Sequence, residues 1–504
     1  MPRTSPIFEP AEKHSTRAPI SRLTEICLAF AVTFALLVPC VWQEHIQAGD
    51  LSSHVYNAWL ATEIKNGDAP GLYIAHPLTN VLCDWLLEAL LSRGGARFAE
   101  RTVCGAAVLV FFWGAFYMIT SVTKRRPWLL APCLAMLAYG LVFTVGFLNF
   151  YVSTGICLWI IGLLWNPSRT RVMLSLPLVV FALLAHAMPV VWAGFVILYV
   201  TVVRRFPSKM RLIVLAATLT TIVAAQLVVM RTFPYRWSLD QVASFLGVMG
   251  LTGTDQFFLS GFKYLIVVVG IGVIWCALFL VRLDQGGMMD DPLVHLWILQ
   301  MAAYILTPLA IQLPQYQHVF SYIPERLSLF TAVVFCAMVG GARYGRGITR
   351  FSALVATIFF TFVFLDGWAL NAIERTVTDL AETLPPGQRL VAAITDSNNR
   401  LNPLLHVADR VCIGRCFSYA DYEPASGQFR VRPYDPNPVV AANMDIVQEM
   451  EEGHHVVTAQ EAPLYSVCDC GGTLCMRRLE AGETTCGFSL PVSVTLTLPA
   501  GNPQ

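Results

Sequence analysis

Long apolar runs alternate with short polar linkers over the first 370 residues of the chain. Each run is long enough to cross the roughly 30 Å hydrocarbon core of a bilayer as a helix. The runs lie near residues 25–43, 101–121, 128–147, 150–165, 211–230, 264–282, 293–312, 327–342 and 350–369. This pattern predicts a polytopic α-helical membrane protein.

A further apolar segment between two basic linkers, residues 172–203, is too long for one span and too short for two full ones. Basic linkers stay on the cytoplasmic side, so a segment with two basic flanks must cross twice or re-enter. We expect two short helices that turn near His186 and Pro189. The total is then about eleven membrane helices.

The basic linkers set the orientation of the chain. They lie at residues 123–127, 166–171, 204–211 and 341–350. The positive-inside rule places them in the cytoplasm together with the basic N-terminal segment, residues 1–23. The outer side then holds residues 44–100, 231–263, 312–326 and the chain after about residue 370. The first apolar run follows arginines, as in a signal peptide, but its length favours an uncleaved helix.

Composition agrees with this division. Hydrophobic residues make up 56% and charged residues 13% of the 504, which excludes an ordinary soluble domain. The formal net charge of +1 gives no reason to expect a nucleic-acid partner. We expect a transmembrane module over residues 24–370, with 44–100 as its first outer loop, and a soluble domain over 371–504.

The tail has a different character. Polar stretches separate short β-like runs at residues 389–394, 429–434 and 493–498, which predicts a small extracytoplasmic α/β or mostly β domain. Six of the fourteen cysteines lie here: Cys412, Cys416, Cys468, Cys470, Cys475 and Cys486. An even number on an oxidising side favours disulfides. A zinc site in "CDCGGTLC" and free thiols are the alternatives, although this spacing is not the usual zinc pattern.

The first outer loop contains "QAGDLSSHVYNAWL", with Asp50 and His54 one helical turn apart. An apolar stripe that ends at Gly67 predicts a helix, and Asp50 lies at its start. Helix capping alone would explain an aspartate there. The other reading is a functional carboxylate at the membrane boundary.

A second helix is expected from His76 onward, with Pro77 in its first turn. Its apolar positions are Val81, Leu82, Trp85, Leu86, Ala89 and Leu90. Such a helix is typical of the membrane interface, as a lid over a cavity or as structural filler.

Positive charges on the outer side run against the usual bias and indicate an anionic partner. They are Arg231, Arg236, Lys263 and Arg326. Arg326 stands in the first turn of a helix that Pro324 opens, and a guanidinium at a helix N-terminus suits phosphate. Arginines that contact lipid headgroups are the simpler reading of each one.

These features together resemble the GT-C class of integral-membrane glycosyltransferases. The likeness depends on the Gly49–Asp50 pair, the interfacial helix, the "GFLN" turn at residues 146–149, the short helices around 175–203 and an outer C-terminal domain. It covers about residues 20–370, and its motifs are short.

The resemblance implies transfer of a sugar from a polyprenyl-phosphate or pyrophosphate carrier to a glycan, lipid or protein acceptor. The place would be the outer face of a bacterial inner membrane, with Asp50 as general base. Since Glu44 is the nearest preceding acid, no acidic pair is present, and a role for Mg or Mn stays open.

The chemistry of such a transfer fits the candidate residues. An inverting transfer needs one carboxylate for the acceptor proton and cations for the leaving phosphate. Asp50 supplies the base, and Arg326 with Arg231 or Arg236 supplies the cations. His54 would orient Asp50 or bind the acceptor. Further pocket candidates are His76, His186, His318 and Tyr322.

Three other functions remain open. A transporter would show ionisable residues within its spans, whereas Gln226 and Gln300 are the notable polar exceptions here. A lipid-linked polysaccharide polymerase or ligase would share the outer arginines. A non-catalytic anchor for the tail would tolerate replacement of Asp50.

Overall fold

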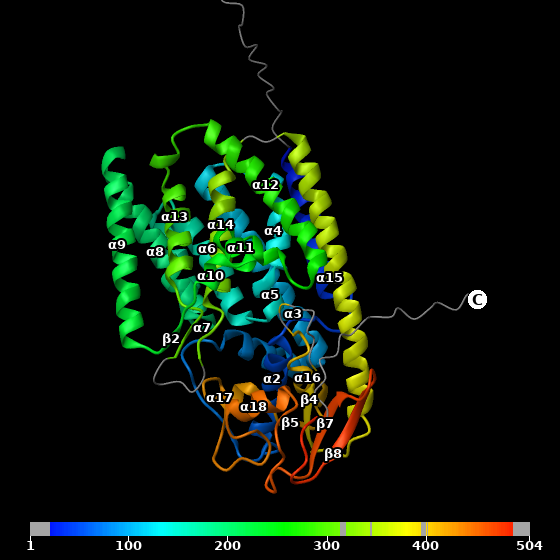
Figure 1. Cartoon of the computed structure of the whole chain (residues 1–504). Coiled ribbons are helices and arrows are strands. Elements are labelled where there is room, and N and C mark those ends of the chain that lie inside the picture. The colour runs from blue at the N-terminus through cyan, green and yellow to red at the C-terminus, as the bar shows by residue number, and fades with distance from the viewer. Residues whose placement is uncertain (1–20, 313–318, 343–344, 395–399, 401, 487–504) are drawn as a thin grey trace, which may run out of the picture.

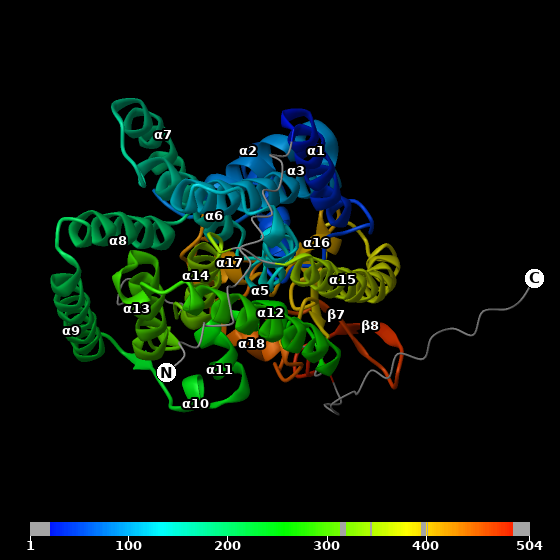
Figure 2. The same cartoon turned by 90° about the horizontal axis from the view of Figure 1, so that it is seen from above.

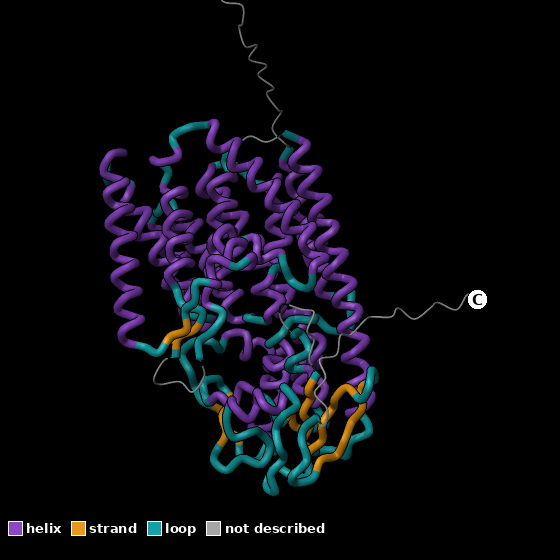
Figure 3. The backbone as a smooth tube through the Cα atoms, in the orientation of Figure 1, coloured by secondary structure: helices purple, strands orange, loops and turns teal. Residues whose placement is uncertain are grey.

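The computed structural model describes residues 21–312, 319–342, 345–394, 400 and 402–486. A helical bundle forms most of this structure, and a small mixed domain covers one of its ends (Figure 1). Figure 3 shows strands in that domain and in one small pair beside the bundle.

Twelve α-helices make up the bundle within the described residues. They are α1 (Arg22–Leu37), α3 (Leu82–Thr123), α4 (Ala131–Ala138), α5 (Leu141–Val145), α6 (Leu148–Leu164), α7 (Arg169–Ala185), α8 (Ala187–Val203), α9 (Ser208–Thr232), α12 (Leu265–Asp284), α13 (Pro292–Leu306), α14 (Ile323–Val339) and α15 (Arg346–Ala381).

Six helical stretches among the described residues are long and apolar enough to cross a membrane. They are Arg22–Cys40, Leu82–Thr123, Trp128–Val145, Ser208–Thr232, Phe262–Asp284 and Gly347–Ala381. Shorter apolar helices cover Leu148–Leu164, Ala187–Val203 and Pro292–Leu306. A multi-helix apolar architecture with possible membrane spans is thus confirmed, and the count of about eleven spans stays a prediction.

Two short helices occupy the ambiguous apolar segment, as expected. α7 and α8 meet at His186, whose backbone is extended and whose ring Nδ1 accepts the Met188 N–H at 3.1 Å. In Figure 2, α7, α8 and α9 lie along one edge of the bundle. Only 6% of the apolar window of α9 is buried, which suits a helix surrounded by lipid.

The first outer loop folds into α2 (Leu51–Asn66), β1 (Leu72–Ile74) and the first arm of α3. α2 ends at Gly67, as predicted, because that residue has a left-handed φ of 87°. The second helix begins at Leu82, so the expected start at Pro77 is wrong. The Thr79 hydroxyl and the Val81 N–H bind the last carbonyls of α7, and Asn80 has a left-handed φ of 60°. These constraints keep the segment before Leu82 out of the helix.

α3 is two helices in sequence, because Gly95 has a non-helical φ of 79° and ψ of 174°. The arm before this kink exposes Trp85 and Leu86, while Cys83 and Leu87 are buried. An exposed apolar face agrees with a place in the membrane interface, which stays a prediction.

Part of the predicted 231–263 outer loop runs back into the bundle. It forms α10 (Asp240–Ala243), α11 (Phe245–Thr252) and a 3-10 turn, η3 (Thr254–Phe257). Gln256 is fully buried and donates to the Ser328 hydroxyl of α14 at 2.7 Å. Part of the loop is therefore packed among the bundle helices, and its place relative to a membrane stays a prediction. Near its start, β2 (Tyr235–Arg236) pairs with β3 (Ala310–Ile311).

The tail begins within α15, which continues past the expected boundary at residue 370 to Ala381. Its other elements are β4 (Arg389–Ala393), α16 (Val407–Cys412), β5 (Phe417–Ser418), α17 (Tyr422–Ser426), β6 (Val431–Pro433), α18 (Met444–Glu451), β7 (Leu464–Asp469) and β8 (Leu474–Leu479). The sheet order is β5-β4-β7-β8, with β4 parallel to both neighbours and β7–β8 a hairpin. The mixed α/β expectation is confirmed, and the β-like run at 493–498 lies outside the described residues.

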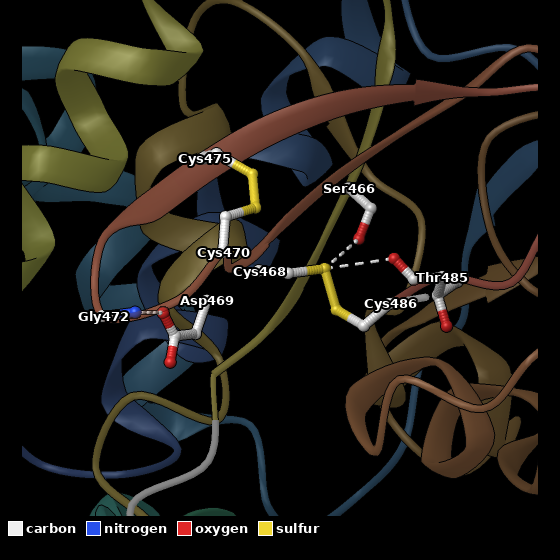
Figure 4. The surroundings of a disulfide bond; sticks show 8 residues. All are labelled: Ser466, Cys468, Asp469, Cys470, Gly472, Cys475, Thr485 and Cys486. Carbon is white, nitrogen blue, oxygen red and sulfur yellow. Dashed lines mark hydrogen bonds between the residues drawn. A yellow bond between two sulfur atoms is a disulfide. The ribbon is translucent and has the colours of Figure 1, made fainter. Parts of the chain in front are cut away.

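All six tail cysteines form disulfides, as expected. The pairs are Cys412–Cys416, Cys468–Cys486 and Cys470–Cys475. Figure 4 shows the last two. This pairing leaves none of the six thiols to bind zinc. Eight cysteines elsewhere in the chain are free, so disulfides are confined to the tail. That contrast agrees with a tail outside the cytoplasm.

The first loop and the tail share one hydrophobic core. β1 pairs antiparallel with β6, so that Tyr73 lies opposite Arg432. Tyr56 and Leu60 of α2 are buried with Leu390 of β4 in the same cluster. The first loop, predicted as part of the transmembrane module, therefore packs with the tail. The two together form one domain, named the outer domain after its expected location.

Candidate functional site

A cavity of about 770 Å³ lies between the bundle and the outer domain. The first loop contributes Asp50 and His54 to its wall, and α14 contributes Arg326. The α5–α6 turn, the α7–α8 turn and the tail supply the rest. Two candidates separated widely in the sequence, Asp50 and Arg326, therefore line the same space.

The backbone of the "AGD" segment docks directly on the "GFLN" turn. The Gly49 and Asp50 N–H groups each donate to a carbonyl at the end of α5 at 2.9 Å. A Cβ at Gly49 would lie 2.6 Å from the Val145 oxygen, and one at Gly146 would lie 2.5 Å from the Asp50 nitrogen. Gly146 also has a left-handed φ of 88°. Glycine is therefore required at both positions for this close approach.

Asp50 occupies the N-cap position of α2, but its side chain makes no capping hydrogen bond. Capping therefore does not account for this carboxylate. Its side chain keeps 25% exposure because it faces the cavity, and Oδ1 lies 3.7 Å from Nε2 of His406. Burial raises the pKa of Asp50 to about 6, against the opposing effects of His54 and Arg326. The carboxylate is ionised at neutral pH and titrates close to it.

His54 is held between acidic side chains. Its Nδ1 lies 2.8 Å from Glu423 Oε1 and 3.6 Å from Asp84 Oδ1. Burial lowers the pKa of His54, but Glu423, Asp84 and Asp50 outweigh burial and raise it to about 9. The ring is thus an imidazolium at neutral pH, one turn after Asp50.

Asp84 is a site residue that sequence reasoning missed. It is buried on the first arm of α3, beside His54. Asn149 of the "GFLN" turn donates to Asp84 Oδ1 at 3.4 Å and accepts the Cys83 N–H at 2.9 Å. An aspartate between the apolar residues Cys83 and Trp85, at the start of the arm, was the available signal.

Arg326 is a buried cation without an ion pair. It is 8% exposed, and its guanidinium lies 4.1 Å from the Phe147 ring and 4.7 Å from the Phe320 ring. Nη1 donates to the Ser321 carbonyl at 2.8 Å, and Nε has no hydrogen-bond partner. Within the described residues no carboxylate lies within 4 Å of it. Because a buried charge needs a counter-charge, the group that suits this part of the cavity is an anion.

Arg400, by contrast, is already neutralised. Its guanidinium lies 3.5 Å from Asp255 Oδ2 and 3.7 Å from Glu325 Oε1, and Nη1 donates to the Asp255 carbonyl. This pairing also occupies Glu325, the acidic neighbour of Arg326. Arg326 is therefore the cation of the cavity that is free to meet a ligand, as far as the described residues show.

The tail supplies the remaining polar wall. The ring of Tyr422 lies 4.7 Å from that of His406, and Glu451 Oε1 lies 3.5 Å from Nδ1 of His406. Burial raises the pKa of Glu451 well above its ordinary value, and the nearby carboxylates of Asp409 and Asp50 act in the same direction. The spacing of these tail residues in the sequence does not identify them as part of the site, because only folding brings them close to Asp50.

The other candidates divide into two groups. Tyr322 and His186 line the cavity, whereas His76, Arg231 and Arg236 are exposed and are not among its lining residues. His318 lies outside the described residues.

The grouping of possible ligand side chains bears on a role for Mg or Mn. Within the part of the chain that the structure describes, no three His, Cys, Asp or Glu side chains are grouped to hold a metal ion. Around Asp50 the nearest such partner is His406, at 3.7 Å. The residues present therefore do not form a site that fits Mg or Mn.

Comparisons with known proteins assign no family to the chain. No protein-family model, curated protein or solved structure matches it. The features that bear on function are therefore the cavity, Asp50 with its imidazolium neighbour His54, and the guanidinium of Arg326, which has no ion pair within the described residues.

Proposed function

We propose that the protein is a membrane glycosyltransferase of the GT-C type, which moves a sugar from a polyprenyl-phosphate carrier to an acceptor hydroxyl. One observation carries the proposal: a titrating carboxylate, Asp50, and a buried guanidinium without an ion pair, Arg326, line the same cavity. A base and an anion site in one space are what such a transfer needs.

The surroundings of Arg326 support a lipid-linked phosphate as the anion. Phe147, Phe150 and Phe320 surround its guanidinium, so a phosphate there would meet both a cation and apolar surface. Arg326 also stands in the first turn of α14, where unpaired backbone N–H groups and the helix dipole favour negative charge.

Asp50 acts as general base in this proposal. Its carboxylate accepts the proton of the acceptor hydroxyl while the hydroxyl oxygen bonds to the anomeric carbon of the sugar. The bond between that carbon and the carrier-phosphate oxygen breaks, and its electron pair stays on the phosphate. Arg326 stabilises the negative charge that develops there. Since the phosphate leaves readily, one carboxylate suffices, and attack from the opposite face inverts the anomeric centre.

His54 favours the ionised form of Asp50, the form in which this carboxylate acts as a base. An imidazolium one turn away lowers the pKa of Asp50 against the effect of burial. Glu423 and Asp84 in turn hold the proton on His54. Asp84 comes from the first arm of α3 and Glu423 from α17 of the tail, so both segments complete the surroundings of the base.

The proposed setting is the outer face of a bacterial inner membrane, with a glycan, lipid or protein as acceptor. Six helices able to span a membrane and a disulfide-bonded tail agree with this setting. The acceptor would reach Asp50 from the side of the tail, whose residues line the same cavity.

Native mass spectrometry of the purified protein tests the proposal. The wild type is expected to retain a polyprenyl-phosphate species or its phospho-sugar. Arg326→Ala should lose that lipid, and Asp50→Asn should hold the sugar-loaded form. Arg231→Ala and Asp68→Asn are matched controls, because both residues are exposed and outside the cavity.

Other outcomes would point elsewhere. Equal retention by all variants would return Asp50 to a structural role and favour a transporter or an anchor for the tail. Retention of a pyrophosphate-linked glycan chain, lost in Arg326→Ala and indifferent to Asp50→Asn, would favour a polysaccharide polymerase or ligase.

A further inference from the structure

A second cavity, of about 530 Å³, lies at the opposite end of the bundle from the tail. The ends of α3, α8, α12 and α14 and the starts of α9 and α13 surround it. Its lining residues are Val122, Thr123, Trp165, Arg204, Arg211, Arg282, Gln285, Asp291, Pro292, Leu293, Ala337, Met338 and Gly341. None of them belongs to the Asp50 cavity.

The charges around this second cavity do not balance. Three guanidinium groups line it, from Arg204, Arg211 and Arg282, against the single carboxylate of Asp291. That carboxylate pairs with Arg282 at 2.6 Å. In the described part of the chain, neither Arg204 nor Arg211 has a carboxylate within 4 Å. Two positive charges therefore face the cavity without a counter-charge.

Backbone contacts hold both unpaired arginines in place. The Arg204 guanidinium lies 4.5 Å from the Trp165 ring, and Nη1 donates to the Trp165 carbonyl at 2.7 Å. Arg211 donates from Nε to the Phe206 carbonyl at 3.1 Å and from Nη1 to the Asp290 carbonyl at 2.8 Å. Each guanidinium keeps further N–H groups for a ligand, and little side-chain entropy remains to be lost on binding.

What sets Arg204 and Arg211 apart from their neighbours is the cavity that they line. Arg205 and Lys209 in the same linker are exposed and outside the cavity. Arg204 is exposed as well and Arg211 is half-buried, but both line the cavity together with the apolar side chains of Leu293, Ala337 and Met338. A cavity with cationic and apolar side chains in its wall suits an amphipathic anion.

We propose that this second cavity binds the phosphate of an anionic lipid headgroup from the leaflet at that end of the bundle. The guanidinium groups of Arg204 and Arg211 would bind the phosphate, and the apolar side chains of the lining would contact the glycerol and the upper part of the acyl chains. The inference is independent of the proposed sugar transfer, because it uses no residue of the Asp50 cavity.

Retention of defined lipids by the full-length protein tests this site. The protein is exchanged into detergent with phosphatidylglycerol or phosphatidylcholine, and binding is read by native mass spectrometry and by the shift in unfolding temperature. We expect selective retention of phosphatidylglycerol. Arg204→Gln with Arg211→Gln should weaken its apparent Kd by about tenfold or more, since charge-assisted contacts are lost. The control pair, Arg205→Gln with Lys209→Gln, should leave it within about twofold.

A charge-conserving variant and a competition experiment complete the test. Arg204→Lys with Arg211→Lys keeps the charge and should retain most of the selectivity, which separates loss of a ligand from loss of the fold. Inorganic phosphate at millimolar concentration should compete only weakly with the lipid. Equal binding of the two lipids, equal loss in the control pair, or stabilisation by inorganic phosphate alone would overturn the proposal.

Discussion

Arg410 ties the segment around Asp50 to three other parts of the protein, and its removal should be costly. It lies on α16, and its side chain is 3% exposed. Its guanidinium lies 3.5 Å from Glu100 of α3 and 3.5 Å from Glu374 of α15. Nη2 also donates to the Ile46 carbonyl at 3.2 Å and to the Ser52 hydroxyl at 2.6 Å. Both flanks of Asp50 are thus attached to one side chain of the tail.

The size of the effect follows from the burial of its partners. Arg410→Ala would leave Glu100 and Glu374, with side chains 1% and 4% exposed, without their guanidinium. Breaking a buried ion pair on one side costs about 3–5 kcal/mol. Since domains are stable by about 5–15 kcal/mol, we expect the outer domain to lose a large part of its stability.

A matched surface arginine provides the control. Arg415 follows α16, is 36% exposed and lies 3.9 Å from Glu382, whose side chain is 60% exposed. Its replacement by alanine should cost about 0–1 kcal/mol, because exposed ion pairs contribute little. Unfolding in detergent, followed by near-ultraviolet circular dichroism against denaturant, gives both free energies.

The position of Asp50 gives a second readout. With Arg410 replaced by lysine, the charge remains but the four contacts cannot all be made, so the domain should stay folded while lipid turnover falls. Equal losses of stability in Arg410→Ala and Arg415→Ala, to within about 1 kcal/mol, would refute the reasoning.

Three more predictions concern pH, the docked turn and the disulfides. Transfer activity should rise as the pH passes about 6, where Asp50 ionises, and fall above about 9, where His54 loses its proton; a flat pH profile of kcat/KM would contradict the assignment. Gly146→Ala should destabilise the protein by about 1–3 kcal/mol, because its Cβ would meet the Asp50 backbone at a left-handed φ; an unchanged unfolding midpoint would count against that contact. Reduction of the disulfides should destabilise the tail, by about 3 kcal/mol for Cys468–Cys486 alone, and thermal unfolding with and without reductant measures it; identical curves would show the bond to be dispensable.

Several features of the site were predictable because each has a local cause. Apolar periodicity placed α2 after Asp50, and Pro324 marked the start of α14, where Arg326 stands in the first turn. The glycines of "AGD" and "GFLN" belonged to the motifs that carried the resemblance, but the close contact between their backbones is a tertiary event that the sequence did not predict.

Other features depend on contacts between distant segments. Glu423 reaches His54 only because the tail packs on the first loop, and Asp84 does so because the first arm of α3 packs on α2. α3 begins at Leu82 and does not include Pro77 as expected, because the end of α7 binds the backbone between these two residues. The apolar segment that forms α11 carries no local sign that it turns back into the bundle, since a loop and a re-entrant segment differ in their partners rather than in their composition.

The pairing of β1 with β6 has a consequence for biosynthesis. Leu72 lies opposite Pro433, so the ribosome must make and export about 360 further residues before the first strand meets its partner. At typical rates of translation this interval lasts roughly 20 to 70 s, during which Tyr56, Leu60 and Leu72 lack their cover. A nascent chain therefore cannot complete the Asp50 cavity early, and a prematurely terminated one never does. The Asp50 cavity can therefore form only after the chain has been synthesised through β6 and the tail has packed on the first loop.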